Sequence, residues 1–162
     1  AERIIKEGGA TGVYFSLQNL AGSADRALYY EVFAPGEKEI LRAANHASAY
    51  NILHICGYLG HRNELDWYKD YEAKTINWAA VVEGVPLEEG KKIFPQHALL
   101  GGFGNLPNDV LCSGTRAEVE AETRRILAAA GRTGVILGAD CTVPSDTDWH
   151  RFEWVRSAAR GA

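Results

Sequence analysis

The chain has 162 residues, of which 46% are hydrophobic and 23% charged, and its formal net charge is -4. This composition is typical of one globular domain and excludes a disordered or collagen-like chain. Lysine and arginine are scattered without a basic stripe, which argues against nucleic-acid binding. No apolar run approaches the ~20 residues that span a bilayer, and no signal peptide is recognised. Three cysteines do not make a disulfide framework, which favours free thiols in a reducing cytoplasm.

Short apolar segments alternate with helical patterns along the chain. The predicted helices cover residues 1–7, 25–33, 35–47, 64–71, 87–93, 115–130 and 148–160. The predicted strands cover residues 11–17, 50–56, 75–80, 97–100 and 134–138, each a short run of β-branched, aromatic or aliphatic residues. The clearest helix begins at Thr115, which forms a capping box with Glu118, and ends before Gly131.

The alternation of strands and helices predicts an α/β fold with parallel strands and right-handed crossovers. It fits a doubly wound sheet or part of a (β/α)8 barrel, and a full barrel needs about 250 residues. The chain opens inside a predicted helix that stops at Gly8-Gly9, so an upstream part or a trimmed leader is expected to be missing. We therefore favour one domain over residues 1–162, the C-terminal portion of a barrel with about five βα units and no N-terminal part.

Candidate functional residues lie where the predicted strands end, because ligands of α/β sheets and barrels bind there. They are Gln18, His54, Cys56, Trp78, Gly101, Gly102, Asp140 and Cys141. His54 and Cys56 alternate along one strand and so project to the same side. With Cys141 they supply an imidazole and two thiolates, a ligand set that suits zinc and leaves one tetrahedral position open. The alternative is a buried Cys56, a hydrogen-bonded His54 and an unrelated Cys141.

Other candidates carry weaker patterns. Gly101 and Gly102 open a glycine-rich segment that either admits a ligand or is a tight exit from a strand. Trp78 either floors a pocket or packs in the core, and Asp140 either orients the metal shell or caps a loop. Glu31 is a candidate carboxylate for proton transfer. Cys112 is expected to be a small buried hydrophobe, and the remaining histidines, His46, His61, His97 and His150, follow no pattern.

At these residues the sequence resembles the C-terminal half of the uroporphyrinogen decarboxylase superfamily, which also holds the methylcobamide:thiol (coenzyme M) methyltransferases. The matching stretches are AERIIKEGGATGVYFSLQ, NILHICG, INWA, LLGGFGN, GTRAEVEAETRRIL and ILGADCTVPSDT. The resemblance implies a (β/α)8 barrel whose first three strands or so are absent here. In its methyltransferase branch, a zinc held by an H-x-C pair and a distant cysteine activates a thiol, and His54, Cys56 and Cys141 match that motif. Decarboxylases carry a His-Gly pair after the last strand, where this chain has Asp140-Cys141.

The resemblance thus predicts zinc-dependent methyl transfer from a methylated corrinoid, free or on a partner protein, to a small thiol. Gln18, Trp78 and Asp140 would shape the mouth of the site. The alternatives are a cofactor-free uroporphyrinogen decarboxylase of porphyrin biosynthesis and a non-enzymatic metal- or corrinoid-binding half-barrel. Because a half-barrel exposes two strand edges, it is expected to form a homo-oligomer or to dock onto its missing half.

Overall fold

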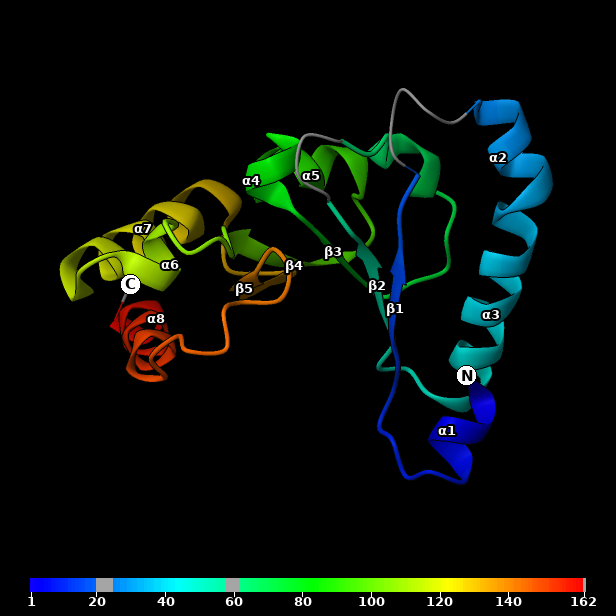
Figure 1. Ribbon diagram of the computed structural model, residues 1–162, viewed down its shortest axis with the longest axis horizontal. Helices are drawn as coiled ribbons and strands as arrows, with labels where there is room; N and C mark the ends of the chain where they lie inside the picture. Colours follow the sequence, from blue (N-terminus) through cyan, green and yellow to red (C-terminus); the bar gives the residue numbers. More distant parts are fainter. Residues whose placement is uncertain (20–24, 58–61, 162) are drawn as a thin grey trace. The chain divides into compact units, whose positions relative to one another are not determined.

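The computed structural model describes residues 1–19, 25–57 and 62–161, and the chain forms two compact units, Ala1–Asn77 and Trp78–Ala162. The first unit contains α1 (Glu2–Lys6), β1 (Tyr14–Leu17), α2 (Arg26–Val32), α3 (Ala34–Ala47), β2 (Ile52–Ile55), the 3-10 helix η1 (Leu65–Tyr68) and most of β3 (Thr75–Trp78). The second contains α4 (Ala80–Glu83), α5 (Leu87–Ile93), β4 (Ala98–Phe103), α6 (Val110–Ser113), α7 (Arg116–Ala130), β5 (Val135–Ala139) and α8 (His150–Gly161). Figure 1 traces these elements in chain order.

The five strands form one sheet in the sequential order β1-β2-β3-β4-β5. β1 pairs in parallel with β2, with Ser16 opposite His54, and β4 pairs in parallel with β5, with Phe103 opposite Ala139. Helices alternate with the strands, as right-handed parallel crossovers require. The predicted α/β class is therefore confirmed, and the sequential strand order is that of a section of a (β/α)8 barrel.

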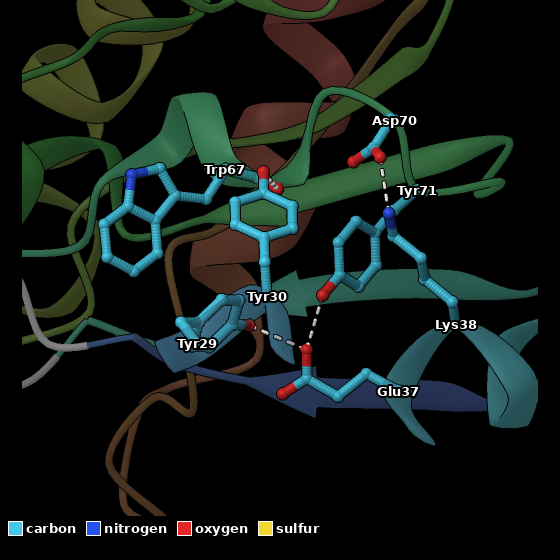
Figure 2. A network of polar contacts seen from close by, with 7 residues as sticks. All are labelled: Tyr29, Tyr30, Glu37, Lys38, Trp67, Asp70 and Tyr71. Atoms are coloured by element: carbon cyan, nitrogen blue, oxygen red, sulfur yellow. Dashed lines mark hydrogen bonds and ion pairs between the residues drawn. The ribbon is translucent and has the colours of Figure 1, made fainter. Parts of the chain in front are cut away.

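In the first unit, α2 and α3 are tied to the segment around η1 by buried aromatic side chains. The side chain of Asp25 caps α2 by accepting hydrogen bonds from the N–H groups of Ala27 and Leu28. Figure 2 shows Glu37 of α3 accepting hydrogen bonds from the hydroxyls of Tyr29 and Tyr71, at 2.7 and 2.5 Å. Lys38 pairs with Asp70 beside this network. The apolar rings supply the buried area, and the shared carboxylate satisfies their hydroxyls.

In the second unit, α7 packs against both α5 and α8. Its first turn has the predicted capping box between Thr115 and Glu118, and its last residue precedes Gly131. Helix and strand approach each other closely at Gly102 of β4. A Cβ atom there would lie 3.2–3.3 Å from the side chains of Ile126 and Leu87, and its φ is +104°. Glycine is therefore the residue that this strand position accommodates.

Several predicted boundaries differ from the structure. The predicted strand exit at Gly101 and Gly102 is wrong, because both residues lie inside β4. The helix predicted over residues 64–71 is only the short 3-10 helix η1, and Cys112, expected to be buried, is half-buried on the short helix α6. The predicted third strand ends at Trp78, after which the chain turns into α4. Within the described parts of the chain, no helix combines the length and apolar character needed to cross a membrane.

Candidate metal centre

His54 lies on β2, with 2% of its surface exposed. Its Nδ1 is hydrogen-bonded to the side-chain oxygen of Asn77, and that oxygen also accepts the hydroxyl of Tyr14. The other ring nitrogen, Nε2, is buried and has no hydrogen-bond partner among the described residues. Burial lowers the pKa of His54, and the hydrogen bond to Asn77 opposes that shift only in part. The ring is therefore neutral at pH 7 and can offer a lone pair to a metal ion.

Cys56 follows β2 by one residue and is held through its backbone. Its N–H donates to the carbonyl of Leu17 at 2.7 Å, which extends the pairing of β1 with β2. Its carbonyl accepts a hydrogen bond from the side-chain amide of Asn63 at 3.0 Å. The side-chain oxygen of Asn63 in turn accepts a hydrogen bond from the backbone N–H of Asn19 at 2.7 Å. This clamp fixes the backbone that carries the thiol.

Cys141 lies in the second unit, directly after the end of β5. The preceding Asp140 donates its N–H to the carbonyl of Phe103 at 2.7 Å and accepts the N–H of Val81 on its carboxylate at 2.7 Å. On the other side of Cys141, the carbonyl of Thr142 accepts a hydrogen bond from the side chain of Asn105 at 2.8 Å. The residues on either side of Cys141 are thus held by hydrogen bonds. Asp140 is bound to the end of β4 and to α4, and Thr142 is bound to the loop that follows β4.

His54, Cys56 and Cys141 are side chains of the kinds that bind a metal ion, and they form a candidate ligand group. The unpartnered Nε2 of His54 also fits this use, since a buried ring nitrogen without a partner is costly unless a ligand takes it. The imidazole and the two thiols suit zinc, and three protein ligands leave a fourth position open.

The remaining predicted site residues lie in different environments. Asp140 is fully buried, and burial raises the pKa of its carboxyl to about 7, although backbone N–H groups, including that of Val81, act in the opposite direction. Trp78 is also fully buried and donates its indole N–H to the carbonyl of Val85 at 2.8 Å, which is the position of a core side chain. Gln18 is exposed just after β1, and Glu31 is exposed on α2. Neither belongs to the His54, Cys56 and Cys141 group, and His61 lies outside the described residues.

The residues that hold His54 and Cys56 in place were not predicted from the sequence. Asn77 and Tyr14 contact the His54 ring or its hydrogen-bond partner, and Asn19 and Asn63 hold the loop of Cys56. A usable signal existed for Asn77, because it is a polar residue within the apolar strand TINW. Buried polar groups need hydrogen-bond partners. An asparagine at that place therefore indicates a polar neighbour, here the histidine of the adjacent strand segment.

Comparisons with known proteins identify the fold. No protein-family model matches the chain, and no curated protein matches it. Among solved structures, a methyltransferase from Methanosarcina mazei superposes with a TM-score of 0.71 and 18% sequence identity. The match covers 96% of this chain and 43% of that protein, so the chain spans less than half of its length. At this identity the likeness shows that the two share a fold.

Proposed function

We propose that this chain is part of a zinc-dependent methyltransferase that moves a methyl group from a methylated corrinoid to a small thiol. In this proposal it belongs to the methylcobamide:thiol branch of the uroporphyrinogen decarboxylase superfamily. The observation that carries the proposal is the candidate ligand group of one imidazole and two thiols, from His54, Cys56 and Cys141, in which the buried Nε2 of His54 has no hydrogen-bond partner among the described residues. The fold that the chain shares with a methyltransferase is consistent with it.

The ligand set explains why no general base is needed. His54, Cys56 and Cys141 would hold the zinc ion, which would supply Lewis-acid chemistry that lowers the pKa of an acceptor thiol. His54 contributes a neutral nitrogen and the two cysteines contribute thiolates, so the protein supplies soft, electron-rich ligands. In the transfer, a bond forms between the acceptor sulfur and the methyl carbon while the bond from carbon to cobalt breaks. Cobalt keeps the electron pair, and the proton of the thiol leaves to solvent.

The first stage of the test measures metal binding. We expect about one zinc per chain after gentle purification, because catalytic sites with three ligands usually retain the ion. Cys56→Ser and Cys141→Ser should each lose most of this zinc. Cys112→Ser is the matched control, because Cys112 lies on α6 outside the ligand group, and it should bind zinc as the wild type does. Less than about a tenth of an equivalent in the wild type would contradict the metal centre.

The second stage measures the reaction. Zinc-loaded protein is mixed with methylcobalamin and coenzyme M or another small thiol, and the loss of the methyl–cobalt bond is followed by visible absorption. We expect demethylation that requires zinc, disappears in Cys141→Ser and persists in Cys112→Ser. Zinc binding without any such turnover would overturn the proposed reaction and favour a metal-binding module instead.

A further inference from the structure

Three side chains of the first unit form a chain of contacts that ends on the unpartnered nitrogen of His54. They come from three different strands: Tyr14 from β1, His54 from β2 and Asn77 from β3. The side-chain oxygen of Asn77 accepts hydrogen bonds from His54 Nδ1 and from the Tyr14 hydroxyl. Asn77 is fully buried and His54 is 2% exposed, so the hydrogen bond between these two side chains is shielded from water, whereas Tyr14 is 52% exposed.

This arrangement determines which ring nitrogen carries the proton. An amide oxygen only accepts hydrogen bonds, so the nitrogen that faces it must be an N–H group. The proton of the neutral His54 ring therefore sits on Nδ1, and Nε2 keeps its lone pair. Nε2 is buried and has no hydrogen-bond partner among the residues that the structure covers. Its lone pair can therefore bind a metal ion.

Tyr14 adds a restraint on the orientation of the ring. Its aromatic ring stacks on the imidazole with a centroid separation of 5.0 Å and an interplanar angle of 29°. Its hydroxyl binds the same oxygen of Asn77 that binds His54. The stacking limits rotation of the imidazole. The hydrogen bond from the Tyr14 hydroxyl keeps the side-chain oxygen of Asn77 turned toward the His54 ring.

We propose that Asn77 is a positioning residue that holds His54 in the tautomer with the proton on Nδ1 and so directs Nε2 toward a bound metal ion. This inference rests on the proposed zinc centre and deepens it. Outer-shell hydrogen bonds to a metal-binding histidine fix its tautomer and raise its basicity, and their loss typically weakens metal binding 10–100-fold.

The main experiment compares zinc dissociation constants measured by competition with a chelator. In Asn77→Leu, which has a similar volume and no acceptor, we expect the dissociation constant to rise about 10–100-fold. Asn77→Asp retains an oxygen acceptor toward His54 Nδ1, so its dissociation constant should stay within a few-fold of the wild-type value. If Asn77 had only a structural role, Asn77→Asp would raise the dissociation constant at least as much as Asn77→Leu, because it buries a charge.

Asn51→Ala is the matched control, because Asn51 is a buried asparagine of the same unit, 1% exposed, that binds Val13, Ser48 and Asn45. It should destabilise the unit without changing the dissociation constant for zinc. An Asn77→Leu protein that folds and binds zinc as tightly as the wild type would overturn the inference.

A second measurement needs neither a variant nor the metal. The nitrogen-15 shifts of the His54 ring in metal-free wild-type protein report its tautomer, and we expect the proton on Nδ1. A proton on Nε2 would overturn the inference even if zinc binds. Failure of the wild type to bind zinc would overturn the proposed function, whereas the tautomer would still decide whether Asn77 orients the ring.

Discussion

The hydroxyl groups of two tyrosines are hydrogen-bonded to the partly buried carboxylate of Glu37. Tyr29 and Tyr71 are 3% and 1% exposed, and both donate to the same carboxylate oxygen. Burial is the largest cause that raises the pKa of each phenol above its ordinary value of 10.0, and the neighbouring Glu37 adds to it. Both tyrosines therefore stay protonated in the folded chain at pH values where they ionise in the unfolded chain.

Tyr71→Phe should lower the free energy of unfolding by about 1 kcal/mol near pH 8, because the carboxylate loses one donor. The raised pKa adds a pH dependence. The contribution of Tyr71 to stability is complete below pH 10 and falls as pH rises above it, because the unfolded chain then releases a proton that the folded chain keeps. The advantage of the wild type over Tyr71→Phe should therefore shrink between about pH 10 and pH 11 in urea denaturation.

Tyr50→Phe provides the control for this comparison, because Tyr50 is 73% exposed. It should leave the stability unchanged at pH 8 and follow the wild type as the pH rises. A constant difference between wild type and Tyr71→Phe across this range would show that ionisation of Tyr71 is not linked to folding.

At the scale of whole elements, the side chain of Trp78 sets how closely helix α5 packs. A Cβ atom on Gly90 would lie 2.2 Å from the Trp78 ring. That ring is fully buried and also packs against Phe94, with centroids 5.9 Å apart. The helix therefore rests directly on the indole, and glycine is required by this contact although it is a poor helix former.

Gly90→Ala should lower the free energy of unfolding by about 1–3 kcal/mol, because the clash with Trp78 outweighs the better helix propensity of alanine. Gly36→Ala on α3 is the matched substitution, since a Cβ atom there would meet nothing within 4 Å. It should be neutral or raise stability by about 0.5 kcal/mol. If denaturation gives Gly90→Ala and Gly36→Ala the same free energy of unfolding, this account of the packing is contradicted.

At the scale of the whole molecule, the sheet has two outer strands. Among the described strands β5 pairs only with β4, and β1 pairs only with β2. β5 is apolar on both faces, with Ile136 46% exposed on one and Val135 and Leu137 lining a pocket of about 430 Å³ on the other. A strand of this kind is a template for pairing with another strand.

We expect the 162-residue chain to associate with a second copy through β5, and sedimentation should report a species larger than the 17.7 kDa monomer. Ile136→Lys should shift the equilibrium toward monomer, because a charged residue on an edge strand opposes pairing. Ile4→Lys is the control, since Ile4 is 59% exposed on α1 and lies on no strand. A well-folded monomer at every concentration would exclude this mode of association.

Much of the fold follows from local patterns in the sequence. The capping box of Thr115, the stop at Gly131 and the short β-branched strands act through neighbouring residues, so they mark element positions without tertiary information. The end of β4 depends instead on pairing with a distant segment, because Gly101 and Gly102 lie opposite Leu137 and Gly138 of β5.

The candidate metal centre divides in the same way. The sequence by itself determined that His54 and Cys56 project together, because alternate residues of a strand share a face. Only the tertiary structure decided that Asn77 and Tyr14 contact the imidazole and that Trp78 packs beneath α5. Strand periodicity is a property of consecutive residues, whereas burial and hydrogen-bond partners arise between segments that the chain brings together only by folding.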